Sequence, residues 1–257
     1  MLSYQHLYHA GNLADVHKHA LLAWVLDYMT HKDKPLSYFE THAGRGYYRL
    51  DSYESRKTGE AAAGIGRVEH AFAPDHPYIR AIDATRAAHG AQAYPGSPLI
   101  AAHLLRMSDR ITLAELHPQE HAALTQIMGK RARIEKRDGY ELVQALCPPE
   151  PRRGVLMIDP SYEVKAEYET IPTFIAALHR KWNVGVILLW YPILEAGLQA
   201  GMIARITHDH PDAQVFEARF PPVREGHRMI GTGLLVLNAP WGMAEEAARI
   251  TALMGAT

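Results

Sequence analysis

The sequence has very little cysteine and no long apolar run. A single cysteine, Cys147, excludes a disulfide framework and any zinc site built from several cysteines, and it suits a reducing cytosol. No apolar stretch approaches the roughly 18 residues of a membrane span. The first residues also lack the charged-then-apolar layout of a signal peptide. We therefore expect a soluble, cytoplasmic protein without membrane contacts.

The chain also lacks an excess of charge of either sign. Its 27 Lys and Arg side chains nearly balance 28 Asp and Glu, which gives a formal net charge of −1. Because such a chain exerts no global attraction on polyanions, any contact with nucleic acid needs a local basic patch. No apolar stripe marks an interface between copies, so we expect a monomer.

Alternating strand and helix patterns fill most of the 257 residues, 47% of them hydrophobic, enough to bury the core of one large domain. A helix is expected over 13–29, with Asn12 as its N-cap. The expected strands are 36–40, 111–115, 131–135, 154–159, 184–190, 215–220 and 234–238. The last two are joined without room for a helix, so they should pair antiparallel. Five parallel strands closed by a C-terminal antiparallel hairpin indicate an α/β, Rossmann-like sheet of the class I methyltransferase type.

Residues 47–94 interrupt this alternation. Helix-like stretches over 60–72 and 78–89 predict a small helical insertion subdomain at 47–94, within a main domain made of residues 1–46 and 95–257. Basic residues lie in or beside this segment: Arg45, Arg49, Arg56, Lys57 and Arg67. Such a scatter is typical either of a solvated face or of a nucleic-acid contact, and Arg45 is the candidate substrate contact.

A glycine-containing loop follows the first expected strand. The strand ends in Glu40, and Gly44 and Gly46 come directly after it. Ligands of open parallel sheets bind beyond the carboxyl ends of the strands, where glycine lets the backbone approach them closely. The alternative is an ordinary tight turn.

Acidic residues end several of the expected strands or follow them closely: Glu40, Glu115, Asp138 and Asp159. Singly, each is more often a helix cap or a solvated loop acid. Together along one sheet edge they predict a pocket for an adenosine cofactor, with Glu115 on the ribose and Asp138 on the adenine amine. Ser97 is expected to cap the helix that begins at Pro98.

The most specific chemical signal is the run Asp159, Pro160, Ser161 and Tyr162. An exocyclic adenine amine is a poor nucleophile because its lone pair is delocalised. A carboxylate and the proline carbonyl can accept its N–H groups and localise that pair, and the carboxylate can take the released proton. Tyr162 supplies a face on which an extruded base stacks. A plain strand-to-turn junction is the alternative.

Two other patterns suggest chemistry less strongly. Histidines crowd the N-terminal region (His6, His9, His17, His19 and His42), but no spacing matches a metal site on a helix, so hydrogen bonding within a pocket is the expectation and no metal is predicted. The run 238–241 also contains an acceptor, a proline and an aromatic residue. It follows the last strand, and we interpret it as packing.

A set of short motifs runs through residues 1 to about 241. It comprises Tyr4, Lys18, His19, Tyr162 and residues 9–12, 14–16, 41–44, 94–98, 115–118, 138–139, 159–160 and 190–192. In this set the chain resembles the RlmJ family, bacterial enzymes that methylate N6 of one adenine in 23S ribosomal RNA. The family pattern has a second proline where this chain has Ser161, which should loosen the loop that presents the base-binding groups.

The resemblance implies a site for S-adenosyl-L-methionine. Its binding residues are His19, His42, Ser97, Glu115, Asp138, Gly139 and Asp159, with Lys18 beside them, and the glycine loop adds Gly44. The resemblance also implies Asp159 as the catalytic acceptor and Tyr4 as a substrate contact. Two alternatives stay open: the same chemistry on DNA adenine, and a non-catalytic nucleic-acid-binding protein for the use of external DNA.

Overall fold

A computed structural model describes residues 5–221 and 228–255. Its centre is a seven-stranded sheet in the order β5-β4-β1-β6-β7-β9-β8. In that order the strands span Arg133–Glu135, Arg110–Ala114, Ser37–Glu40, Gly154–Ile158, Val186–Leu194, Met229–Leu237 and Gln214–Arg219. The first five are parallel, and β9 pairs antiparallel with both β7 and β8. The predicted Rossmann-like methyltransferase sheet with its C-terminal hairpin is confirmed.

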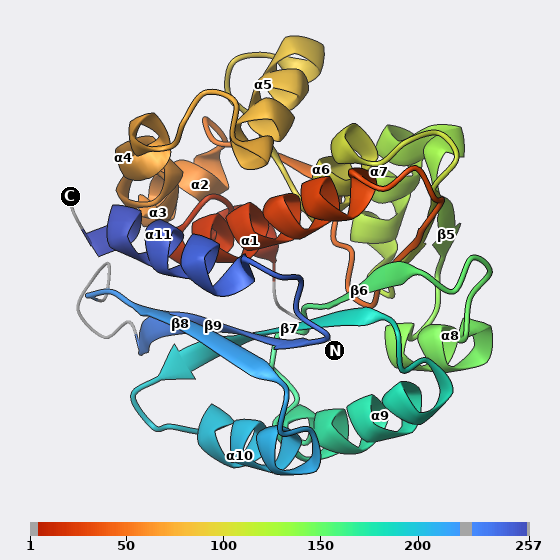
Figure 1. Cartoon of the computed structure of the whole chain (residues 1–257). Coiled ribbons are helices and arrows are strands. Elements are labelled where there is room, and N and C mark those ends of the chain that lie inside the picture. Colours follow the sequence, from red (N-terminus) through yellow and green to blue (C-terminus); the bar gives the residue numbers. More distant parts are fainter. Residues whose placement is uncertain (1–4, 222–227, 256–257) are drawn as a thin grey trace.

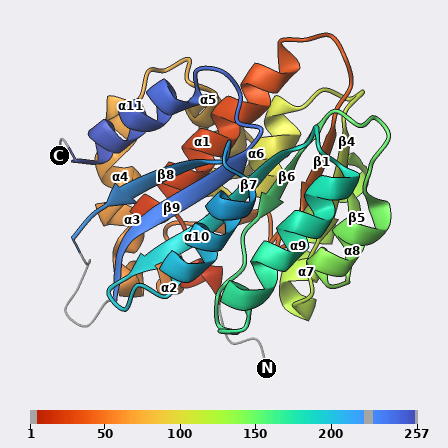
Figure 2. The ribbon, with the colours of Figure 1, turned by 60° about the horizontal axis from the view of Figure 1, so that its bottom comes forward.

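Both faces of this sheet are buried, as parallel strands require. Alternate residues of a strand point to opposite faces: Tyr38 of β1 joins one core cluster, and Phe39 joins the other. Helices α1 (Leu13–Thr30) and α11 (Met243–Gly255) cover one face, and α9 (Glu167–Lys181) and α10 (Gln199–Asp209) cover the other (Figure 1). Figure 2 shows α9 and α10 side by side across the second face.

Helix α1 is the central helix of its layer and follows the predicted course. Asn12 caps it, because the Asn12 side chain accepts a hydrogen bond from the Asp15 N–H at 2.9 Å. The helix contacts α5 (Pro77–His89), α6 (Ser97–Leu104) and α11, so almost all of it is buried. Its polar side chains are therefore held inside the protein, where they need partners.

Two further helices connect strands at the β5 edge of the sheet. Helix α7 (Pro118–Met128) joins β4 to β5, and α8 (Gly139–Leu146) joins β5 to β6. Within the described ranges 5–221 and 228–255, no helix is long and apolar enough to cross a membrane.

Residues between β1 and α6 differ in part from the prediction. The predicted helical stretches are present: 78–89 is α5, and 60–72 is helical but divided into α3 (Glu60–Ala63), α4 (Ile65–Val68) and a 3₁₀ turn. The break is at Gly64, whose ψ of −113° is not helical, and only glycine fits there because a Cβ would lie 2.1 Å from the carbonyl oxygen of Gly11. The segment also contains a short helix, α2 (Tyr53–Thr58), and two strands that were not predicted, β2 (Tyr47–Arg49) and β3 (Ala93–Pro95), which pair antiparallel.

The expected role of Ser97 as a helix cap is wrong. Gly96 occupies the N-cap position of α6 without a side-chain hydrogen bond, and Ser97 is the first helical residue. The Ser97 hydroxyl instead donates to the carboxyl group of Glu40 at the end of β1. Ser97 thus joins the start of α6 to the end of β1.

Candidate active site

A cavity of about 650 Å³ opens where β1, β4 and β6 end. Residues that follow these strands line it, among them His42 after β1, Glu115 after β4 and Asp159 after β6. The start of α1 and residues of β7 supply the other walls. Its volume is within the roughly 300–1,000 Å³ of small-molecule sites, and its position is the one that parallel sheets offer to ligands.

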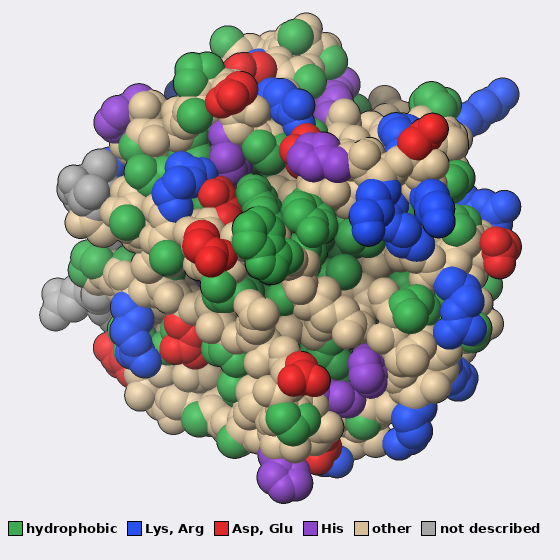
Figure 3. All heavy atoms as spheres, in the orientation of Figure 1, with side chains coloured by type: hydrophobic (Ala, Val, Ile, Leu, Met, Phe, Trp, Pro, Cys, Tyr) green, Lys and Arg blue, Asp and Glu red, His purple; other side chains and the backbone are tan. Residues whose placement is uncertain are grey.

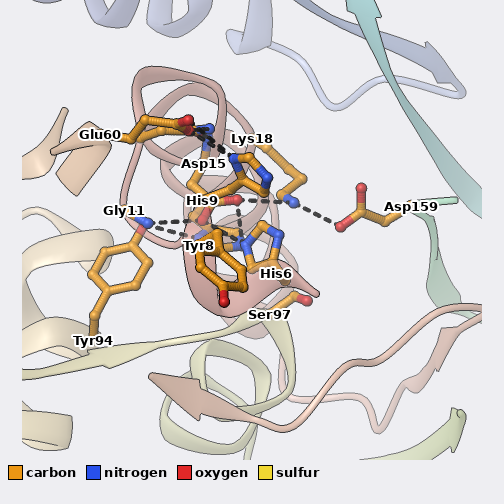
Figure 4. A network of polar contacts seen from close by, with 12 residues as sticks. His6, Tyr8, His9, Gly11, Asp15, Lys18, Glu60, Tyr94, Ser97 and Asp159 are labelled. Carbon is orange, nitrogen blue, oxygen red and sulfur yellow. Dashed lines mark hydrogen bonds and ion pairs between the residues drawn. The ribbon is translucent and has the colours of Figure 1, made fainter. Parts of the chain in front are cut away.

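A buried ion pair joins α1 to the end of β6. Lys18 Nζ donates to Asp159 Oδ2 at 2.6 Å and lies 3.1 Å from Asp15 Oδ1 (Figure 4). Burial alone would lower the pKa of the Lys18 ammonium, but the two carboxylates raise it above its ordinary value. Lys18 therefore carries a fixed positive charge between two acids.

Asp15 links this pair to the N-terminal segment. Its carboxylate contacts His6 Nε2 at 2.8 Å and accepts a hydrogen bond from the Gly11 N–H at 2.9 Å (Figure 4). Burial alone would raise the pKa of Asp15, but His6 and Lys18 lower it well below its ordinary value. The fully buried carboxylate is therefore charged, and it holds both the segment and the lysine in place.

A second buried carboxylate anchors the same segment to the inserted helices. Glu60, at the start of α3, contacts His9 Nδ1 at 2.9 Å and accepts a hydrogen bond from the Asn12 side chain at 3.1 Å. Thr58 donates to the carbonyl oxygen of Tyr8 at 2.6 Å. Within residues 5–221 and 228–255, no three His, Cys, Asp or Glu side chains are arranged to hold a metal ion.

The glycine loop is tied to the end of β4. Gly44 has φ +62° and Gly46 has φ +90°, conformations that favour glycine. The Gly44 N–H donates to Glu115 Oε2 at 2.7 Å, and the His117 N–H donates to Glu115 Oε1 at 2.7 Å. Burial raises the pKa of Glu115. The carboxylate thus shapes the loop and also faces the cavity.

Aromatic rings form the wall beside Asp159. Tyr162 stacks on Tyr168 with ring centroids 4.7 Å apart, and its hydroxyl donates to the carbonyl oxygen of Trp190 at 2.7 Å. Tyr162 has φ 55°, a rare conformation for a residue with a side chain. The Trp190 ring lies 5.1 Å from Lys18 Nζ. A hydrogen bond and a stacking partner thus hold the Tyr162 ring on the cavity wall.

Two histidines on the cavity wall are neutral. Burial lowers the pKa of His42 to about 4 and that of His19 to about 3. His42 Nδ1 lies 2.7 Å from the Thr41 hydroxyl, and His19 Nδ1 lies 3.0 Å from the Tyr94 hydroxyl. Neutral imidazoles can donate or accept hydrogen bonds without adding charge.

The structure brings most of the predicted site residues to one cavity and leaves a few outside. The lining includes Lys18, His19, His42, Gly44, Ser97, Glu115, Asp159, Pro160 and Tyr162. Glu40 is fully buried behind the lining, where burial raises its pKa to about 8. Tyr4 lies outside the described residues.

Three predicted residues have structural contacts near the cavity instead. Asp138 caps α8 by accepting from the Glu141 N–H at 3.0 Å. A Cβ on Gly139 would lie 2.0 Å from the carbonyl oxygen of Thr41, so this glycine allows α8 to approach the loop after β1. Arg45 forms a two-pronged ion pair with Glu120, at 2.6 and 2.8 Å.

Asp15 and Trp190 also line the cavity, but the sequence named them only within the motifs of the family resemblance and gave them no role in the site. Asp15 precedes Lys18 by three positions and His19 by four, which places all three on one face of α1, and this spacing is a usable signal. Trp190 lies in the middle of β7, and nothing in its local pattern separates it from a core residue. The run 238–241 does not line the cavity, and the Asn238 amide donates to the carbonyl oxygens of Asn183 and Gly185.

The sheet order and the strand-end cavity define a class of protein: an enzyme with the Rossmann-like methyltransferase fold. Comparison with known families specifies it further. The family model described as "Ribosomal RNA large subunit methyltransferase D, RlmJ" matches residues 33–256. The chain belongs to this family of ribosomal RNA large-subunit methyltransferases.

Individual relatives agree with this assignment. The "Ribosomal RNA large subunit methyltransferase J" of Escherichia coli (strain K12) is 37% identical over 256 residues, covering 96% of this chain and 90% of the relative. The protein of the same name from Haemophilus influenzae (strain Rd) is 36% identical over 266 residues, covering 97% and 92%. A crystal structure of a Legionella pneumophila protein has a TM-score of 0.85 and 35% identity, and covers 95% of this chain and 91% of that one.

Proposed function

We propose that this chain transfers a methyl group from S-adenosyl-L-methionine to N6 of an adenine in 23S ribosomal RNA. The observation that carries the proposal is that Asp159, Pro160 and Tyr162 line the same cavity as the glycine loop. A donor on the loop and a base on the Tyr162 side would then face each other across Asp159. The names of the relatives support ribosomal RNA as the substrate.

The cavity has the chemistry that an adenosine cofactor needs. Glu115 presents a carboxylate at the end of β4, the type of group that accepts hydrogen bonds from ribose hydroxyls in this kind of sheet. Gly44 and the neutral His42 lie beside it, and Ser97 and His19 line the same cavity. These residues would hold the cofactor, which supplies a methyl group on a positively charged sulfur.

Asp159 and Pro160 are the groups that would activate the amine. Because Lys18 holds Asp159 Oδ2, the second carboxylate oxygen is left to accept one N6–H, while the Pro160 carbonyl accepts the other. Accepting both hydrogens localises the lone pair of N6 and aims it at the methyl carbon. The Asp159 carboxylate would take the proton that N6 loses as the methyl group passes to it, while the electron pair of the broken carbon–sulfur bond would stay on the sulfur of the departing cofactor product.

Tyr162 and Trp190 would receive the extruded base. An adenine cannot reach Asp159 while it is stacked in a helix, so it must leave the stack, and an aromatic ring repays part of that cost. The Tyr162 hydroxyl is already bound to the Trp190 carbonyl, so the ring is fixed before the base arrives. Fixed geometry is worth a large part of the rate in a displacement that depends on alignment.

Replacing Asp159 tests the proposal. Purified Asp159→Ala protein should methylate a 23S ribosomal RNA transcript roughly 10²–10⁴ times more slowly than the unmodified chain, because it lacks the proton acceptor. Asp212→Ala, at an exposed residue outside the cavity lining, serves as the control. Equal rates for Asp159→Ala and the unmodified chain would refute the proposed role.

The substrate class is tested separately, with matched RNA and DNA oligomers that contain the same adenine. Transfer to RNA alone supports the proposal, and equal or better transfer to DNA favours a DNA adenine methyltransferase. Calorimetry with S-adenosylhomocysteine covers the third possibility. No detectable binding would favour a non-catalytic nucleic-acid-binding protein.

A further inference from the structure

The loops that enter the parallel strands carry a concentration of positive charge. Four segments lie at this end of the sheet: residues 31–36 before β1, 105–110 before β4, 148–153 before β6 and 180–185 before β7. Strand register places them together, because Ser37 pairs with both Arg110 and Gly154. We call these four segments the amino-edge patch.

The patch has a charge opposite to that of the rest of the chain. Its basic residues are Lys32, Lys34, Arg106, Arg110, Arg152, Arg153, Arg180 and Lys181, and its acidic residues are Asp33, Asp109 and Glu150. The formal charge of these segments is therefore +5, in a chain whose total is −1. Figure 3 shows Lys and Arg side chains gathered on the right-hand side of the molecule, where α1 and α9 end in Figure 1.

Several of these cations are held by backbone carbonyls, which fix a guanidinium without neutralising it. Arg110 donates to the carbonyl oxygen of Glu150, and Arg152 to that of Lys181. Arg153 donates to the carbonyl oxygens of Lys34 and Met29. These hydrogen bonds to neutral carbonyls leave the guanidinium charges in place, and guanidinium groups are well suited to bind phosphate.

The crowding of like charges shows in the pKa of Arg153. Burial lowers this pKa, the nearby Arg106 guanidinium lowers it further, and the Asp109 carboxylate raises it in part. Arg106 itself is paired with the buried Asp109 at 3.0 Å, and it also donates to the carbonyl oxygen of Lys32 at 2.9 Å. The two guanidinium groups thus lie close together at this surface, with one buried carboxylate, Asp109, beside them.

The basic residues expected at the mouth of the cavity are different. Arg45 is paired with Glu120, and Arg49 is paired with Asp51 at 2.7 Å. A carboxylate partner cancels the charge that a phosphate would otherwise meet. Arg45 and Arg49 are therefore neutralised, whereas the described segments of the amino-edge patch, at the opposite end of the sheet, keep a formal charge of +5.

We infer that the amino-edge patch binds the phosphate backbone of ribosomal RNA outside the nucleotides that enter the cavity. The inference rests on the proposed function, since it extends the surface used by the same substrate. Strand β6, which separates the two sites, has five residues and is about 17 Å long. A short target loop therefore reaches only the cavity, and a longer RNA can reach the patch as well.

The test removes charge from exposed patch residues that lie far from the cavity. The variant Lys32→Gln/Lys34→Gln/Arg180→Gln/Lys181→Gln changes side chains that are all exposed. The control Arg80→Gln/Lys136→Gln/Arg205→Gln/Arg219→Gln removes the same charge from exposed positions outside the patch and outside the cavity lining. Binding is measured by fluorescence anisotropy against salt, with a long 23S ribosomal RNA fragment and with a short hairpin containing the target adenine.

For the long RNA, the patch variant should bind at least about tenfold more weakly than the control at physiological salt. In a plot of log affinity against log salt concentration, the slope for the patch variant should be shallower than that for the control by about 3–4. For the short hairpin, the two variants should bind alike and show the same kcat. Equal affinity and slope for the long RNA in both variants would overturn the inference.

The outcomes separate this inference from the proposed function. If the unmodified chain methylates and binds RNA but the two variants behave alike, only the patch inference fails. If the unmodified chain binds neither the long RNA nor the short hairpin, both the proposed substrate and the patch inference fail. A weaker patch variant with an unchanged salt slope would indicate a structural defect and would also overturn the inference.

Discussion

The two ends of the central sheet differ in the partners of their cationic side chains. At the carboxyl ends of the strands, Asp159 and Lys18 neutralise each other inside the protein at 2.6 Å. At the amino ends, Arg152 and Arg153 bind backbone carbonyls, and their charges remain available to solvent. One end is built to hold a few groups in fixed geometry for chemistry, and the other to attract a polyanion.

Replacing a lysine by methionine at each end should give the largest difference in the free energy of unfolding. Lys18→Met leaves the buried Asp15 and the adjacent Asp159 without their shared cation, which should cost about 3–5 kcal/mol of unfolding free energy. Lys34→Met removes an exposed charge and should change stability by less than about 0.5 kcal/mol. Urea denaturation of the two variants measures the difference. Similar losses in both would show that the Lys18 ion pair has no special role in the fold.

A smaller contrast concerns glutamates at the two ends. Glu40 is fully buried, and its pKa is about 8 in the folded protein against 4.5 ordinarily. Between about pH 4.5 and pH 8, the Glu40 carboxyl group is therefore protonated in the folded protein and ionised in the unfolded chain. The contribution of this protonated carboxyl group to the free energy of unfolding is complete below about pH 4.5 and is lost as the pH rises towards 8. Glu40→Gln should be more stable than the unmodified chain by a few kcal/mol at about pH 8.5, and by much less at about pH 5.

The control for this measurement lies at the amino end. Glu150→Gln changes an exposed carboxyl and should shift stability equally at both pH values. Thermal or urea unfolding at the two pH values gives the comparison. A Glu40→Gln effect that does not depend on pH would mean that Glu40 is ionised in the folded protein throughout this range.

Local patterns were sufficient to predict the sheet and much of the site. The apolar run ending in Glu40 and the following Gly44 and Gly46 predicted a strand and a close-approach loop, and the structure contains both. The motif at Asp159 was predicted in the same way, from residues adjacent in sequence. Patterns of this kind need no knowledge of distant partners.

Features that depend on distant contacts were not predictable in this way. The helix expected over 60–72 breaks at Gly64, where only glycine fits against Gly11, more than fifty residues earlier. Ser97 has the sequence signature of a cap, but its hydroxyl donates to Glu40 at the end of another strand. The amino-edge patch is assembled from four separate segments, and only strand register shows that they are neighbours.

Identifying the methylated nucleoside tests whether the chain transfers the methyl group to N6 of adenine. A 23S ribosomal RNA transcript is incubated with the protein and labelled S-adenosyl-L-methionine, digested to nucleosides and separated by mass-resolved chromatography. The label should appear in N6-methyladenosine, and Asp159→Asn should form this product roughly 10²–10⁴ times more slowly. Label in any other nucleoside, or undiminished N6-methyladenosine with Asp159→Asn, would contradict this prediction.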